Sequence, residues 1–155
     1  MRKLILIVAF SLALVFPPNF GTASRQHVDC DMLAEVFETE AEELGGRCKV
    51  EIIRKNLNVT HMGKRLSPET MGLTFHFVFE NVDGETAVIG ELALLEAEVN
   101  PVIDELQKGN LEVSSLYNHM LHERPRILYV HFQGIGDVKQ QAKTIKAAIE
   151  KTGYN

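Results

Sequence analysis

The stretch Leu73-Thr74-Phe75-His76-Phe77-Val78-Phe79-Glu80 has the clearest strand pattern in the chain. Phe75, Phe77 and Phe79 alternate with other residues, so all three point to one side of an extended strand. The sequence Asn81-Val82-Asp83-Gly84 follows, and Asp-Gly is typical of a tight hairpin turn. The pattern therefore predicts a β-hairpin with one buried face and one open face.

Residues 86–95 supply the partner strand of this hairpin. If Glu80 faces Glu85, the apolar residues of both strands share one side, which makes the register self-consistent. The same pairing places His76 diagonal to Glu91 on the other side, within reach of long side chains.

Further strands are expected on both sides of this hairpin, together with three amphipathic helices. Polar residues 56–70 are expected to be a loop with at most one short strand. The alternation of strand pairs and helices predicts an α+β domain with two layers, an antiparallel sheet with helices packed on one face. A β-β-α unit occurs twice, at 71–109 and 111–152. The expected helices lie at 29–46, 100–109 and 137–153, the second with Asn100 as its cap and Pro101 at its first helical position. The other strands are expected at 48–54, 111–117 and 126–132.

The N-terminus resembles a secretory signal peptide. Arg2 and Lys3 precede an apolar run over residues 4–16, and small residues follow at 22–24. The run is shorter than the ~20 residues that span a bilayer, although an uncleaved anchor is the alternative. We expect a signal peptide at 1–24 and a periplasmic or secreted protein without stable membrane insertion after cleavage.

The remaining residues, 25–155, are expected to form a single domain. The formal net charge of −5 and the lack of a basic cluster exclude nucleic acid as a partner. A small molecule or a cell-envelope component is the expected partner. The two cysteines, Cys30 and Cys48, predict one disulfide in an exported protein, with two buried thiols as the alternative.

Chemically active side chains concentrate in residues 116–132, which hold His119, His122 and His131, three of the six histidines. One hypothesis is a divalent metal such as zinc, because histidine and carboxylate ligands suit it. The candidate ligands are His119, His122, Glu123 and His131.

Strand geometry argues against a single centre. In a plain hairpin His119 lies opposite Arg126, and His131 lies near Ser114, about 16 Å further along. His131 would instead meet His76 or Glu91 on a neighbouring strand.

The other hypotheses are acid–base catalysis and ligand binding. His119 with Glu123 or Glu98 could form a general base dyad of a metal- or histidine-dependent hydrolase. A binding site for a small anion could use an arginine clamp and a tyrosine face. A non-catalytic protein-interaction domain of the cell envelope remains the third possibility. The expected ligand-binding residues are Tyr117, Asn118, His119, Arg126 and Glu98.

Several short motifs resemble a known bacterial family. They are Glu98-Val99-Asn100-Pro101-Val102, Asn118-His119-Met120-Leu121, Pro125-Arg126 and His131-Phe132. Together they are similar to the LppY/LpqO-like family of exported proteins of unknown function, over about Val50 to Ala148. The resemblance implies export but no activity. The family often has His-Asn-His-Met and an aspartate after the glycine, whereas this chain has Tyr117 and Glu91 at those positions.

Overall fold

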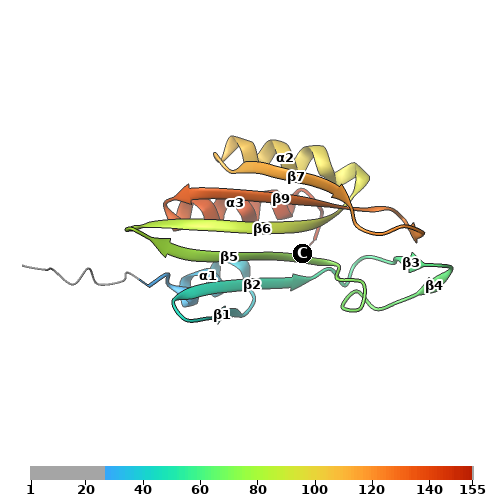
Figure 1. Ribbon diagram of the computed structural model, residues 1–155, viewed down its shortest axis with the longest axis horizontal. Helices are drawn as coiled ribbons and strands as arrows, with labels where there is room; N and C mark the ends of the chain where they lie inside the picture. The colour runs from blue at the N-terminus through green and yellow to red at the C-terminus, as the bar shows by residue number, and fades with distance from the viewer. Residues whose placement is uncertain (1–26, 155) are drawn as a thin grey trace, which may run out of the picture.

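The computed structural model describes residues 27–154, so the predicted signal peptide at 1–24 lies outside the described residues. The main feature is a six-stranded antiparallel sheet with strand order β1-β2-β5-β6-β9-β7 (Figure 1). Its strands are β1 (Ala41–Glu43), β2 (Arg47–Ile53), β5 (Thr74–Val82), β6 (Glu85–Leu95), β7 (Glu112–Asn118) and β9 (Ile127–Gly136).

The helices are α1 (Cys30–Phe37), α2 (Val99–Lys108) and α3 (Val138–Glu150), with a 3-10 turn η1 (Glu96–Glu98) before α2. In Figure 1, α1 and α3 lie behind the sheet, and α2 lies along the edge formed by β7. The predicted α+β class with an antiparallel sheet is confirmed. The two-layer arrangement is less regular than expected, because α2 sits beside an edge strand and packs mainly on α3.

The central hairpin forms as predicted but in a different register. Val82 pairs with Glu85, so the turn consists of only Asp83 and Gly84, both with positive φ (53° and 93°). Such a two-residue turn matches the right-handed twist of the flanking strands. The expected pairing was wrong by two residues, which keeps each side chain on its predicted face but sets His76 directly opposite Glu91.

The main core lies between the helices and one face of the sheet. Phe75, Phe77 and Phe79 have no exposed surface, and each helix contributes to the same cluster, for example through Leu33 and Ile145. The opposite side chains of β5 remain partly exposed. The alternation in the sequence therefore predicted which face is buried.

The first helix is shorter than expected. It ends at Phe37, where Glu38 adopts a left-handed conformation (φ 53°), and Ala41–Glu43 pairs with β2 as an edge strand. The expected continuation to Gly45 was wrong, because backbone pairing with β2 takes over a segment whose spacing also fits a helix. Asn100 was likewise expected as a helix cap but lies inside α2, which begins at Val99.

The disulfide prediction is confirmed. Cys30 and Cys48 are bonded and join the start of α1 to β2. No helix within residues 27–154 is long and apolar enough to cross a membrane.

A smaller three-stranded sheet forms where a loop was expected. It contains β3 (Thr60–His61), β4 (Lys64–Arg65) and β8 (Glu123–Arg124), in the order β4-β3-β8. A second apolar cluster lies next to it and includes Ala93 and Tyr129, which alternate along β6 and β9 with residues of the main core. This cluster therefore packs on the side of the sheet opposite to the helices and covers one end of the open face.

Candidate functional site

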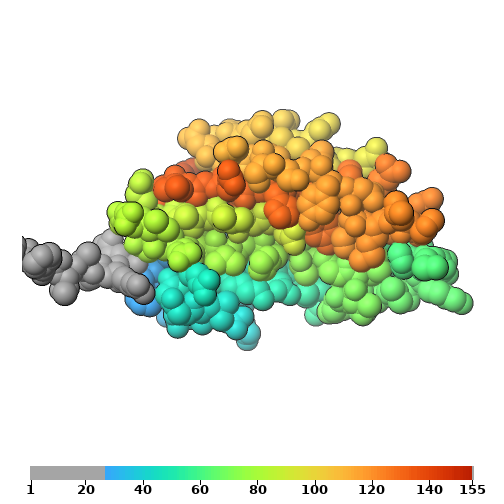
Figure 2. Space-filling view, in the orientation of Figure 1, coloured from blue at the N-terminus to red at the C-terminus, as the bar shows by residue number. Residues whose placement is uncertain are grey.

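Polar side chains form a row across the open face of the sheet. The strand pairings set Glu51 beside His76, His76 beside Glu91, and Glu91 beside His131. Neighbouring strands are about 4.8 Å apart, so adjacent members of the row are within reach of each other. Figure 2 views the molecule from this open side.

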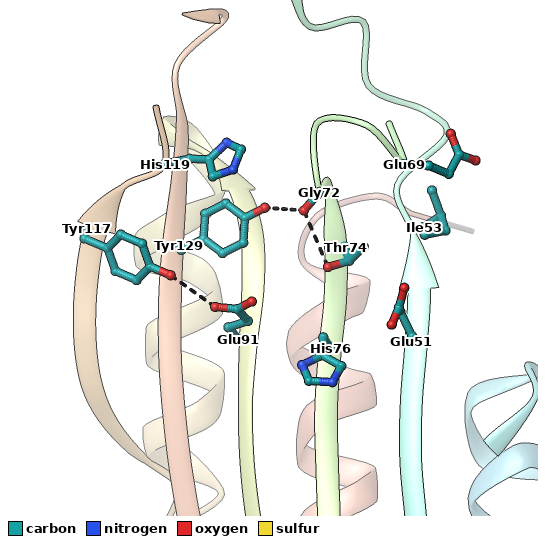
Figure 3. A pocket seen from close by; sticks show the side chains of 10 residues that line it. All are labelled: Glu51, Ile53, Glu69, Gly72, Thr74, His76, Glu91, Tyr117, His119 and Tyr129. Atoms are coloured by element: carbon teal, nitrogen blue, oxygen red, sulfur yellow. Dashed lines mark hydrogen bonds between the residues drawn. The ribbon is translucent and has the colours of Figure 1, made fainter. Parts of the chain in front are cut away.

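This row borders an open groove of about 510 Å³ (Figure 3). One wall comes from β2 and the loop before β5, and the other comes from β6, β7 and β9. The groove is lined by Glu51, Ile53, Glu69, Gly72, Thr74, His76, Glu91, Tyr117, His119 and Tyr129.

Glu91 of β6 contacts side chains of the next two strands of the sheet, β9 and β7. Its Oε2 lies 2.7 Å from His131 Nε2 and accepts a hydrogen bond of 3.1 Å from the Tyr117 hydroxyl. The same hydroxyl lies 3.2 Å from His131 Nε2. The expectation that His131 meets Glu91 rather than His119 is therefore confirmed.

Two tyrosines form a stacked pair on this side of the groove. The rings of Tyr117 and Tyr129 are 5.7 Å apart with an interplanar angle of 24°. The Tyr129 hydroxyl donates a hydrogen bond to the Gly72 carbonyl oxygen, which fixes the buried ring. Burial raises the pKa of both phenols, and the nearby Glu91 carboxylate raises each pKa further. Both hydroxyls are therefore neutral hydrogen-bonding groups at physiological pH.

His119 is held by a buried carboxylate. Its Nδ1 lies 3.1 Å from Glu123 Oε2, and the other oxygen of Glu123 accepts hydrogen bonds from the backbone N–H groups of Ile127 (2.9 Å) and Met120 (3.4 Å). The side chain of Glu123 is only 1% exposed. This arrangement orients the imidazole, because a fixed acceptor at Nδ1 determines which nitrogen carries the proton. Nε2 is then left without a hydrogen-bond partner among residues 27–154.

The β7–β9 pairing differs from the expected plain hairpin. An irregularity between Val113 and Ser115 shifts the register, so that Ser115 rather than Ser114 pairs with His131. The backbone N–H of His119 consequently bonds to the carbonyl oxygen of Ile127 instead of facing Arg126. A bulge of this kind inserts one residue in one strand and leaves no clear mark in the sequence.

The expected ligand-binding residues divide among three places. Tyr117 and His119 line the groove, whereas Asn118 and Arg126 line a separate cavity of about 370 Å³. Alternation along β7 explains the division, because consecutive residues of a strand point to opposite faces.

Glu98 belongs to neither cavity. It forms a bidentate ion pair with the fully buried Arg54, with distances of 2.6 and 3.0 Å. The alternative dyad of His119 with Glu98 is therefore not formed, and His119 pairs with Glu123.

The metal candidates do not converge. His119 and Glu123 form one pair, His131 pairs with Glu91, and His122 lines the other cavity. Within residues 27–154 no group of three or more histidine, cysteine, aspartate or glutamate side chains is placed to hold a metal ion.

Several groove residues were not predicted from the sequence. Tyr129 lies two residues before His131 and therefore on the same face of the strand, and Glu51 alternates with the buried residues of β2. The period of two could therefore have placed both residues on the open face. Glu69 lies in the 56–73 segment, where no regular pattern pointed to it.

Searches of curated proteins and of solved structures found no significant match. A family model described as Domain of Unknown Function (DUF1259) matches residues 31–151. This match spans all but the end residues of the fold, from α1 to α3, and includes the groove and the tip of the β7–β9 hairpin. The chain therefore belongs to the family described as Domain of Unknown Function (DUF1259).

Proposed function

We propose that this protein binds a saccharide, neutral or amino-substituted, in the groove on the open face of the sheet. The observation that carries the proposal is the composition of the groove wall. It combines three carboxylates, two histidines and a tyrosine face, and no lysine or arginine lines it.

The carboxylates determine which ligands suit the groove. Glu51, Glu69 and Glu91 are acceptors when ionised, so they favour a ligand that presents many hydrogen-bond donors. Lys49 lies outside the groove and pairs with Glu51 at 2.9 Å, which leaves the other oxygen of that carboxylate available. Sugar hydroxyls and an amino group are such donors, whereas an anionic ligand would be repelled.

Tyr117 offers the apolar contact that the ring face of a sugar requires. Its side chain is partly exposed (40% for the residue), and it is backed by Tyr129 and hydrogen-bonded to Glu91. A tyrosine that is held in place loses little conformational entropy when a ligand packs on it. The groove is therefore organised before binding.

A second candidate is histidine-dependent hydrolysis of a bound ligand. The observation that favours it is the free Nε2 of His119, whose other nitrogen is held by the buried Glu123. A histidine oriented by a carboxylate is the usual arrangement of a general base. Loss of hydrolysis of acylated sugars in His119→Ala, against retention in His122→Ala, would support this activity, and equal background rates in all three proteins would refute it.

The cellular setting is also a proposal. We propose that the chain is an exported protein of the LppY/LpqO-like group, which acts in the cell envelope. The signal-peptide pattern at 1–24, the disulfide and the Asn118-His119-Met120-Leu121 motif support this view. Envelope glycans would then be the natural source of a saccharide ligand.

The binding test uses isothermal titration calorimetry with glucose, glucosamine, N-acetylglucosamine and their short oligomers. We expect one of these to bind, and Tyr117→Ala to weaken that binding at least about tenfold, or ~1.4 kcal/mol. Leu116→Ala is the matched control, because Leu116 is exposed on the same strand but on its opposite face. Absence of binding across the panel, or equal weakening by both variants, would contradict the proposal.

A further inference from the structure

The tip of the β7–β9 hairpin carries a second cavity, of about 370 Å³, whose chemistry is opposite to that of the groove. Its wall includes Asn118, His122, Arg124 and Arg126. We propose that this tip cavity binds an oxyanion, a carboxylate or phosphate group of a small ligand.

The two arginines are available for a ligand. Neither Arg124 nor Arg126 forms an ion pair with a carboxylate among residues 27–154, although the chain carries a formal net charge of −5. Guanidinium groups bind carboxylate and phosphate with parallel hydrogen bonds in a fixed fork. Arg124 is already oriented, because its Nη1 donates a 2.7 Å hydrogen bond to the carbonyl oxygen of Glu123.

The backbone that carries these side chains is held in place. Arg124 lies in β8 and pairs with Thr60 of β3, while the backbone N–H of Met62 bonds to the carbonyl oxygen of His122. At the other end, Ile127 begins β9 directly after Arg126. Arg124 therefore extends from a paired strand and Arg126 directly precedes one, which lowers the entropic cost of ordering them around a ligand.

The only acidic residue of this wall does not oppose an anion. The Glu123 carboxylate is buried, and its oxygens are occupied by the backbone N–H groups of Met120 and Ile127 and by His119. Asn118 contributes a side chain already ordered by a 2.7 Å hydrogen bond from its Nδ2 to the Met120 carbonyl oxygen. The remaining polar side chains of the wall, Asn118, His122 and the two arginines, all carry N–H groups that can donate to an oxyanion.

The tip cavity is separate from the groove, although Glu123 of its wall contacts His119 of the groove. The two share no lining residue, and the neighbours Tyr117 and Asn118 belong to different cavities. A failed anion test would therefore leave the saccharide proposal untouched, and the reverse also holds.

The test is a titration of ¹⁵N-labelled protein with inorganic phosphate and, separately, with citrate at constant ionic strength. We expect saturable amide shifts at residues 118–126 with at least one anion, and a loss of affinity of about tenfold or more in Arg124→Gln/Arg126→Gln. A response to phosphate alone would indicate a phosphate site, and a response to citrate alone a carboxylate site.

Arg47→Gln is the matched control, because Arg47 is an exposed arginine at the start of β2, outside the tip cavity. If the double variant does not fold, Arg126→Lys keeps the charge but removes the fork, and we expect it to weaken binding severalfold. The proposal is overturned if wild-type protein shows no saturable shift, or if Arg47→Gln weakens binding as much as the tip variants.

Discussion

Arg54 is the largest buried charged side chain among residues 27–154, and its environment shows how single residues support this fold. Arg54 has no exposed surface and forms two hydrogen bonds to the Glu98 carboxylate. Its guanidinium also donates to the carbonyl oxygen of Ala93 and lies 5.0 Å from the ring centre of Phe75. Glu98 in turn accepts the backbone N–H of Leu95 at 2.8 Å. The pair therefore joins the end of β2 to the turn between β6 and α2.

Glu98→Gln removes the counter-charge and leaves the Arg54 guanidinium buried without compensation. We expect the free energy of unfolding to fall by about 3–5 kcal/mol, since breaking a buried ion pair from one side carries this cost. Urea denaturation measures the change, and Glu96→Gln, two residues away and exposed, should stay within about 0.5 kcal/mol of wild type. A stable Glu98→Gln protein would show that this ion pair contributes little.

Tyr129 determines part of the pH dependence of stability. Because its pKa is raised in the folded protein above the unfolded value of about 10, the folded state retains a proton that the unfolded state loses. Stability should therefore fall as the pH rises above about 10. In Tyr129→Phe the free energy of unfolding should therefore fall less steeply with pH above about 10 than in the wild type. At neutral pH it should be lower than in the wild type by about 1 kcal/mol, because the hydrogen bond to Gly72 is lost.

Urea denaturation of both proteins from neutral to alkaline pH tests this difference. Other groups that titrate in this range, such as Lys49, are common to both proteins and cancel in the comparison. Identical slopes for wild type and Tyr129→Phe would contradict the assignment.

At the scale of elements, the sequence predicts faces better than it predicts registers. The Phe75, Phe77 and Phe79 alternation identified the buried side of β5, because burial follows a period of two in a strand. The predicted register of the same hairpin was wrong by two residues. A shift by two residues leaves every side chain on its face, so the pattern of apolar residues fits both registers equally well. In the observed register His76 lies directly opposite Glu91 rather than diagonal to it.

The observed register requires a glycine at position 90. A Cβ at this position would lie 2.5 Å from Phe77 Cβ, 2.6 Å from Phe132 Cζ and 2.8 Å from the His76 carbonyl oxygen. Gly90→Ala should therefore lower the free energy of unfolding by about 3 kcal/mol or more. Ile89→Ala, at the exposed neighbouring position, should cost less than about 1 kcal/mol. Comparable losses in thermal or urea denaturation would argue against this register.

At the scale of the whole molecule, the disulfide attaches α1 to β2 on the core side of the sheet, whereas Glu51 of the same strand lines the groove. Cys30 and Cys48 are 18 residues apart in sequence, and Cys48 is fully buried. The pairing could be predicted because two cysteines in a chain with a signal-peptide pattern leave one choice. By contrast, the site could be located only in outline, since strand order brings Glu51, Glu91 and Tyr117 together from distant segments.

Replacing both cysteines with alanine should lower the free energy of unfolding by about 3 kcal/mol, because the loop they close regains freedom in the unfolded chain. Saccharide binding to the folded variant should be unchanged. Denaturation of wild type with and without reductant provides the matched comparison. Equal stability in all these states would contradict a structural role for the disulfide.

The central claim is that the open-face groove binds a saccharide, and a mapped titration tests it most directly. Titration of ¹⁵N-labelled protein with the best-binding sugar of the panel should shift the amides of Glu51, His76, Glu91 and His119 with one common affinity, while Arg124 and Arg126 stay unchanged. In Tyr117→Ala the same shifts should require at least about ten times more sugar. The account is contradicted if saturable shifts map away from the groove residues, or if Tyr117→Ala binds as tightly as wild type.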